Sequence, residues 1–228
     1  MSATKEERIR QEFNRWAEAG RGEGMIEGHS DVAEQMIEAM DIQPSDRVLD
    51  LGCGIGWATR SIAAHLSDGS AVGADISDEM IARAQANPEN PKNVSFSVAS
   101  AASLPFGDSY FDKVFSVESL YYYPDIPGAL KEVNRVMKTG GLAFVMVNLF
   151  WENEGSRHWV EKLAIPAQLL SEAEYRKHFE DAGFSGVRTE RFHDRRPMEE
   201  LLKPNSFDSL EMVKKGLEAG SLVVVAEK

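Results

Sequence analysis

The sequence predicts an α/β protein with a Rossmann-like, doubly wound sheet of seven strands, and three observations lead to this fold class. An apolar, β-branched run at 47–51 leads directly into a glycine-rich turn and then into a helical pattern. Strand-like and helix-like segments then alternate as far as Leu149, which is typical of βαβ units and a mostly parallel sheet. Two later strand-like segments leave no room for full parallel crossovers, so one antiparallel strand is expected near the carboxyl end.

The first forty residues are expected to form a helical region that precedes the sheet. Residues 5–19 carry three large apolar side chains at helical spacing, which predicts an amphipathic helix. Four glycines within 20–29 predict a mobile connection, and a second helix is expected at about 30–40. We therefore interpret residues 1–40 as an N-terminal helical cap or lid over a domain at 41–228. The alternative is a fixed helix packed on that domain beside a flexible loop.

The other elements follow from apolar periodicity and from turn residues. Strands are expected at Arg47–Leu51, Ala71–Asp75, Val94–Val98, Phe111–Val117, Leu142–Leu149, Val187–Phe192 and Ser221–Ala226. Helices are expected at Trp57–Leu66, Asp78–Ala86, Ile126–Met137 and Ser171–Ala182. Glycines within 138–141 should end the third of these helices, and 197–217 should be helical and irregular.

Composition excludes several classes of function. The formal net charge of −12 in 228 residues argues against a nucleic-acid groove, which needs clustered Lys and Arg. The single cysteine, Cys53, excludes an internal disulfide and fits a cytoplasmic protein. The charged amino terminus and the absence of long apolar runs predict neither a signal peptide nor a membrane span. Potential ligand residues do not cluster at metal-binding spacings, so no metal is expected.

The turn after the first strand carries the functional information. Residues 48–56 read Val-Leu-Asp-Leu-Gly-Cys-Gly-Ile-Gly. A dinucleotide-binding turn would place its third glycine at position 57, where this chain has Trp57. Asp50 would repel a pyrophosphate, but it suits a ligand that carries an amino group and a sulfonium. The glycines that would let backbone approach this ligand are Gly52, Gly54 and Gly56.

Three later segments extend the pattern. Gly73-Ala-Asp-Ile-Ser ends the second strand, residues 99–112 join the third strand to the fourth, and residues 130–142 join a helix to the fifth. In this order they resemble the class I S-adenosylmethionine-dependent methyltransferases, and the glycine-rich turn resembles motif I of that family. The resemblance covers about 47–149. It is nearest to the small-molecule methyltransferases similar to the C-methyltransferases of ubiquinone and menaquinone biosynthesis.

The resemblance implies how S-adenosylmethionine would bind. Asp75 would accept both ribose hydroxyls, although NAD enzymes use the same position and a helix N-cap is the alternative. Ser100 stands where many family members carry an aspartate that accepts the adenine amino group, so a hydroxyl and the Ala101 amide would replace that carboxylate. The implied donor-binding residues are Asp50, Gly52, Gly54, Gly56, Asp75, Ile76, Met80, Ser100, Ala101 and Val117.

Methyl transfer leaves a weak signature in sequence, because holding the reactants in line supplies most of the rate enhancement. A base helps if the acceptor is a carbon or hydroxyl acid. The candidates by expected location are His29, Glu118, Tyr121 and His158. For Glu118 the alternative is a solvated loop acid, and for the histidines it is an exposed or packing residue.

The sequence therefore predicts a methyltransferase that uses S-adenosylmethionine on a small-molecule acceptor. Two other classes stay open: a protein that binds S-adenosylmethionine without transferring methyl, and a nicotinamide-dependent oxidoreductase. Residues 1–40, 151–166 and 197–217 lie outside the shared motifs, so they are expected to form the acceptor pocket.

Overall fold

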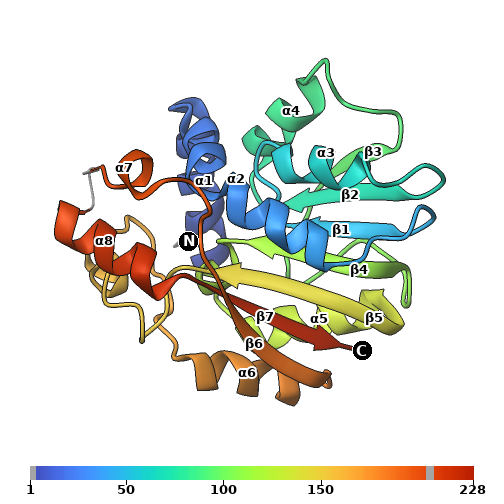
Figure 1. The fold of residues 1–228 in the computed structure, drawn as a ribbon. Coiled ribbons are helices and arrows are strands. Elements are labelled where there is room, and N and C mark those ends of the chain that lie inside the picture. Colours follow the sequence, from blue (N-terminus) through green and yellow to red (C-terminus); the bar gives the residue numbers. More distant parts are fainter. Residues whose placement is uncertain (1–3, 204–207) are drawn as a thin grey trace.

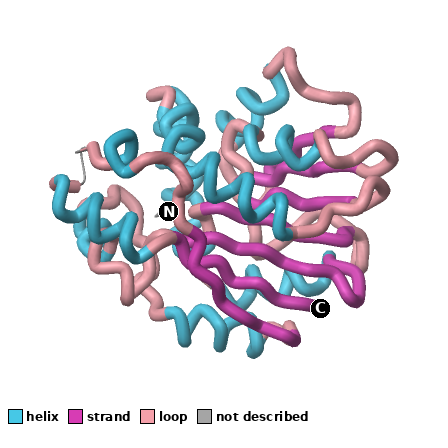
Figure 2. Tube along the Cα trace, in the orientation of Figure 1, coloured by secondary structure: helices cyan, strands magenta, loops and turns pink. Residues whose placement is uncertain are grey.

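The computed structural model describes residues 4–203 and 208–228 and contains one seven-stranded sheet in the order β3-β2-β1-β4-β5-β7-β6. Figures 1 and 2 show the strands as a central layer with helices packed around it. The strands are β1 (Arg47–Leu51), β2 (Ser70–Asp75), β3 (Val94–Val98), β4 (Phe111–Val117), β5 (Met137–Val147), β6 (Ser185–Phe192) and β7 (Ser221–Glu227). The helices are α1 (Lys5–Glu18), α2 (Arg21–Ala39), α3 (Trp57–Ala63), α4 (Asp78–Ala86), α5 (Ile126–Val136), α6 (Glu172–Asp181), α7 (Met198–Leu201) and α8 (Leu210–Ala219), with short 3₁₀ turns η1 (Leu120–Tyr122) and η2 (Arg157–Glu161).

The direction of the strands confirms the predicted fold class. β3, β2, β1, β4 and β5 pair with their neighbours in parallel, whereas β7 is antiparallel to both β5 and β6. Within the described residues, β7 is therefore the one strand that runs against the others. The strand order reverses between β2-β1 and β4-β5, and this switch point is where open α/β sheets bind their ligands.

The sheet is buried on both faces. Along β7, Leu222 and Val224 join the apolar cluster that contains α5 and α6, while Val223 and Val225 join the cluster that contains α2 and α3. Each of these four side chains is fully buried. A strand covered on both faces shows an unbroken apolar run, and that is why 221–226 could be predicted as a strand from sequence.

The prediction of a mobile glycine connection at 20–29 is wrong. Only Gly20 breaks the chain, with φ of +70°, and α2 begins at Arg21, nine residues before the expected start. Packing offsets the poor helix propensity of glycine, about 1 kcal/mol per residue. A Cβ at Gly22 would lie 2.8 Å from the Ile55 side chain, so the glycine lets α2 approach the turn after β1.

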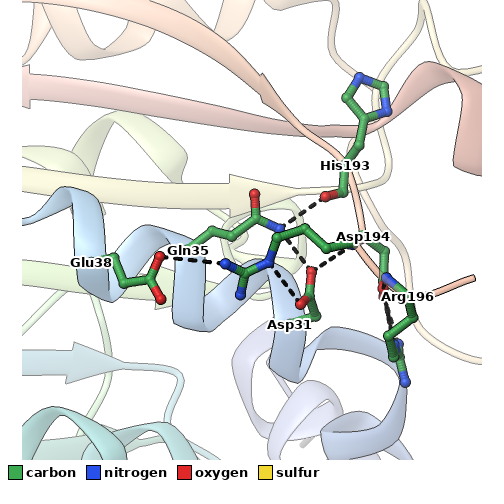
Figure 3. Close-up of polar contacts among 7 residues, drawn as sticks. Asp31, Gln35, Glu38, His193, Asp194 and Arg196 are labelled. Atoms are coloured by element: carbon green, nitrogen blue, oxygen red, sulfur yellow. Dashed lines mark hydrogen bonds and ion pairs between the residues drawn. The ribbon is translucent and has the colours of Figure 1, made fainter.

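Polar contacts fix α2 against the segment that follows β6 (Figure 3). Asp31 accepts hydrogen bonds from the Arg195 backbone at 2.8 Å and from its side chain at 3.0 Å. Gln35 donates to Asp31 at 2.7 Å and to the His193 carbonyl at 2.8 Å. Arg196 donates to the Glu27 carbonyl at 2.9 Å. These bonds tie two turns of α2 to a distant segment, so α2 is a fixed wall of the domain.

The boundary between α5 and β5 also differs from the prediction. The helix ends at Val136 and the strand begins at Met137, so 138–141 belongs to β5 and does not act as a glycine stop. Met137 pairs with Phe111, and Lys138 forms an ion pair with Asp112 at 2.7 Å. The pairing register of β4 and β5 shifts between Phe111 and Lys113, so the two strands remain paired on either side of the irregular stretch.

The expected helical and irregular stretch at 197–217 is seen as α7 and the greater part of α8, and its residues 204–207 lie outside the described part of the chain. In the ranges that the structure describes, every helix is too short or too polar to cross a membrane.

Candidate functional site

A cavity of about 690 Å³ opens at the carboxyl ends of β1, β2 and β4. Its walls include the turn after β1, the loop after β3 and the cavity-facing sides of α1 and α2. This volume lies in the range of small-molecule sites. The cavity thus occupies the switch point of the sheet, where the sequence predicts the ligand.

The glycine turn leaves room for a ligand at one position and makes close packing possible at another. Gly54 has φ of +51°, and a Cβ placed on it would meet nothing within 4 Å. Gly52 has φ of +77°, and its Cβ would lie 2.4 Å from that of Ser119. Gly56 lies outside the cavity wall, where a Cβ would strike the Phe96 ring. Gly54 is therefore the glycine whose backbone a ligand can approach, whereas Gly56 serves packing.

Asp75 ends β2 in the cavity wall and organises the turn beside it. Its carboxylate accepts hydrogen bonds from the Gly54 amide at 2.9 Å and from the Ser77 amide at 2.8 Å. Ser77 caps α4 by accepting from Met80 at 3.0 Å, so the N-cap role falls to Ser77 and not to Asp75. Burial raises the pKa of Asp75. A carboxylate offers about four lone-pair sites, more than these two amides use, so it can also accept from hydroxyl donors of a ligand.

Asp50 is a second acidic group in the same wall. It is 2% exposed, and the Thr59 hydroxyl donates to it at 2.6 Å. Burial, joined by the nearby charge of Asp75, raises the Asp50 pKa to about 7. Among the described residues, neither Asp50 nor Asp75 forms an ion pair. Two buried carboxyl groups of this kind favour a positively charged ligand, because its charge would stabilise their ionised forms.

The loop after β3 and the start of α4 form one end of the cavity. Ile76, Met80, Ser100 and Ala101, which the sequence predicts to bind the donor, all line it. The Ser100 hydroxyl donates to the carboxylate of Glu6, a residue of α1 that also lines the cavity. The sequence interpretation missed Glu6, because nothing in an amphipathic helix shows which loop its polar side meets.

Glu118 follows β4 in a strained and buried position. Its φ is +55°, which a non-glycine residue rarely adopts, and its exposure is 6%, so the alternative of a solvated loop acid is wrong. The carboxylate accepts from the Asn148 amide and, at 2.9 Å, from the Tyr121 hydroxyl. Burial raises the Glu118 pKa to about 7. Strain of about 1–3 kcal/mol persists where the surroundings hold a residue in place, often at functional sites.

Aromatic rings from α1 and η1 form the wall next to Glu118. Phe13 packs edge-on against Trp16 and against Tyr122, with ring centroids 5.1 Å apart in both pairs. Tyr121 and Tyr122 are buried and line the cavity. This wall presents a large apolar surface to a bound molecule.

The remaining predicted residues divide into two groups. Val117 and His29 line the cavity, and burial, together with the Arg196 charge, lowers the pKa of His29 to about 4. His158 lies outside the cavity wall, with its Nε2 2.8 Å from Asp208. A second hollow of about 370 Å³ shares His29 and Asp208 with the first and extends it towards α8. Among the four candidate bases, Glu118, Tyr121 and His29 thus meet at one cavity and His158 stands apart.

The fold and the site together define a class of protein: a Rossmann-like domain with a cavity of ligand size at the switch point of its sheet. Comparisons with known proteins make the class specific. Residues 49–145 match the family described as "Methyltransferase domain". YrhH of Bacillus subtilis, which is named as a methyltransferase, is 32% identical over 64% of this chain and 77% of its own length. A demethylmenaquinone methyltransferase of Staphylococcus aureus is 28% identical over 73% of this chain and 79% of its own.

A solved structure is similar over nearly the whole chain. It is the complex between the Haloferax volcanii Trm112 methyltransferase activator and a protein named as a methyltransferase, with 33% identity and a TM-score of 0.86. The match covers 95% of this chain and 97% of that one. Three other curated relatives are longer, and the chain spans 47%, 44% and 31% of their lengths. This chain belongs to the class I S-adenosylmethionine-dependent methyltransferases.

Proposed function

We propose that this protein transfers a methyl group from S-adenosylmethionine to a small molecule that binds in the cavity. The observation that carries the proposal is that Asp50, Asp75 and Glu118 line one cavity. Asp75 faces the turn at Gly54, Asp50 lies in the same wall, and Glu118 leaves the neighbouring strand. The first two suit the ribose and the cationic part of the donor, and the third suits a proton-transfer step.

The residues of the donor end fit the group that they would hold. S-adenosylmethionine, when bound, supplies a methyl group on a positively charged sulfur. Asp75 would accept the ribose hydroxyls, and Asp50 would offset the positive charge. The open space beside Gly54 lets backbone face the ligand without a Cβ between them.

Glu118 is the best placed base among the candidates. A base works best when its pKa lies near the operating pH. The Glu118 pKa is raised to about 7, while that of His29 is lowered to about 4, which makes the imidazole a weak base. Burial raises the pKa of Tyr121 well above its usual value, so its hydroxyl stays protonated and orients Glu118. In this scheme the acceptor's proton passes to Glu118 as the acceptor gains the methyl group.

The cavity walls indicate the class of acceptor. Phe13, Trp16, Tyr122 and Trp159 line the cavity, and this aromatic surface favours a planar or apolar molecule over a charged one. Glu118 adds a requirement for an acidic hydroxyl or carbon next to that surface. A phenol, an enol or a quinol-like ring meets both requirements.

Transfer of labelled methyl tests this function. The protein is incubated with methyl-labelled S-adenosylmethionine and a panel of phenols and quinols, and the products are identified by mass spectrometry. Label in at least one acceptor and release of S-adenosylhomocysteine are expected. Tight donor binding without transfer to any acceptor in the panel or in a cell extract would instead favour a non-catalytic binding protein.

We also propose that α1 acts as a lid on the donor, while α2 stays fixed. Glu6, Ile9, Phe13 and Trp16 of α1 line the cavity, and Gly20 is the sole break before α2. Hydrogen exchange at 5–18 is expected to slow when S-adenosylhomocysteine binds, with little change in α2. Equal protection of α1 with and without ligand would contradict a lid.

A protein partner is the third proposal. The relative of known structure was solved with the Trm112 methyltransferase activator. We propose that this chain binds a similar activator, because the likeness extends over 95% of its length. Sedimentation of the chain mixed with purified Haloferax volcanii Trm112 is expected to show a species heavier than either alone. Separate boundaries at tens of micromolar would count against this proposal.

A further inference from the structure

The Glu6 side chain occupies an unusual place for a residue of the amino-terminal helix. It lies in the cavity wall with Ser100, Ala101 and Ala102, at the end formed by the loop after β3. The Ser100 hydroxyl donates to its carboxylate and accepts from the Ala102 amide at 3.1 Å. Ser100 therefore has its donor committed to Glu6, and the carboxylate brings the negative charge that Ser100 itself lacks.

Two sets of contacts order α1: a capping box stabilises its first turn, and bonds of Asn14 attach the helix to α4. Thr4 and Glu7 form a capping box, in which each side chain accepts from the backbone amide of the other. Further along the helix, Asn14 donates to Asp78 at 2.9 Å and accepts from Ser77 at 2.6 Å. In the described conformation these bonds join α1 to the start of α4, with Glu6 in the cavity wall.

We propose that Glu6 accepts the hydrogen bond of the adenine 6-amino group, and so selects a 6-aminopurine donor. The inference rests on the proposed binding of S-adenosylmethionine. A carboxylate accepts hydrogen bonds and cannot donate them when ionised, so it pairs with an amino group and repels the oxygen of a 6-oxopurine. Ser100 positions the carboxylate. A helix that precedes the glycine turn by about thirty residues in the sequence would then supply the specificity for the base.

Calorimetric titration with two ligands tests this role. S-adenosylhomocysteine carries the 6-amino group, and S-inosylhomocysteine carries an oxygen in its place. The wild type is expected to prefer the amino ligand by tenfold or more, about 1.4 kcal/mol. In Glu6→Gln the preference should fall to near unity, because an amide can donate to the oxygen as well as accept from the amino group.

Two further variants separate recognition from helix packing. Glu18→Gln removes the same charge from an exposed position on α1 and should keep the wild-type preference. Adding Ser100→Asp to Glu6→Gln should restore the preference, because a carboxylate returns to the same end of the cavity. An unchanged ligand ratio in Glu6→Gln overturns the proposal. Failure of the wild type to bind either ligand instead overturns the proposed donor.

Discussion

Glu118→Gln is expected to lower the turnover number about 10²–10⁴-fold at saturating donor, the usual contribution of a general base. Glutamine keeps an oxygen that can accept from the Asn148 amide, but it cannot take up a proton. The wild-type rate should rise with pH through about 7, where the Glu118 carboxyl ionises. The variant should lose this rising limb. Initial rates from pH 5.5 to 8.5, with an acceptor found by labelling, measure both effects.

Tyr121→Phe is the matched control for this prediction. Its hydroxyl donates to Glu118 at 2.9 Å and helps to lower the carboxyl pKa. Removing it should move the rising limb to higher pH and leave most of the maximal rate. A Glu118→Gln enzyme with the wild-type turnover number and pH profile would show that Glu118 is not the base.

Glu118→Gln should also change how the stability of the folded protein depends on pH. In the folded protein the Glu118 pKa is about 7, above the value of about 4.5 without burial, so the folded state holds its proton over this range. The stability contributed by this group is full below about pH 4.5 and is lost as pH rises through about 7. Relative to wild type, Glu118→Gln should therefore be more stable at pH 8 than at pH 5 in thermal unfolding.

Asp75→Ala is expected to weaken binding of S-adenosylhomocysteine by about 10²-fold or more. Two hydrogen bonds from ribose hydroxyls to a carboxylate are lost, and each contributes roughly 1.5–3 kcal/mol at most. The Gly54 amide also loses its acceptor, which loosens the turn. Asp75→Asn should show a smaller loss, because its amide oxygen can still accept one of these bonds.

Asp68→Ala controls for the Asp75 substitution. Asp68 is exposed in the turn before β2, at the opposite end of the strand from Asp75, and its loss should leave ligand affinity unchanged. Calorimetry measures the affinities, and thermal unfolding shows whether each variant is folded. If the folded Asp75→Ala protein binds S-adenosylhomocysteine with the wild-type affinity, Asp75 does not bind the ribose.

Much of the fold could be predicted because local pattern and tertiary packing agree there. β1, β3, β4 and α4 have the predicted boundaries, since each has an apolar period bounded by turn residues or a helix cap. That the predicted donor-binding residues of the glycine turn and β2 lie at one cavity could be predicted for the same reason. The glycine turn and Asp75 lie within a few residues of strand ends, and parallel strands bring their carboxyl ends to one edge.

The prediction failed where tertiary contacts decide the structure. Glycines at 20–29 favour a loop by propensity, but Gly22 is needed for contact with Ile55, and Gly24 and Gly28 line the cavity. The burial of Glu118 depends on the chain path after β5. Nothing in the sequence connects Glu6 to Ser100, 94 residues away. Long-range pairs of this kind require the structure.

Calorimetric titration of the wild-type protein with S-adenosylmethionine and with NAD tests the central claim most directly. Micromolar or tighter binding of S-adenosylmethionine and no detectable binding of NAD are expected. Affinity should also rise from pH 6 to pH 8, because the positively charged donor favours the ionised form of Asp50, whose pKa is raised to about 7. Tight binding of NAD without binding of S-adenosylmethionine would contradict this account of the site.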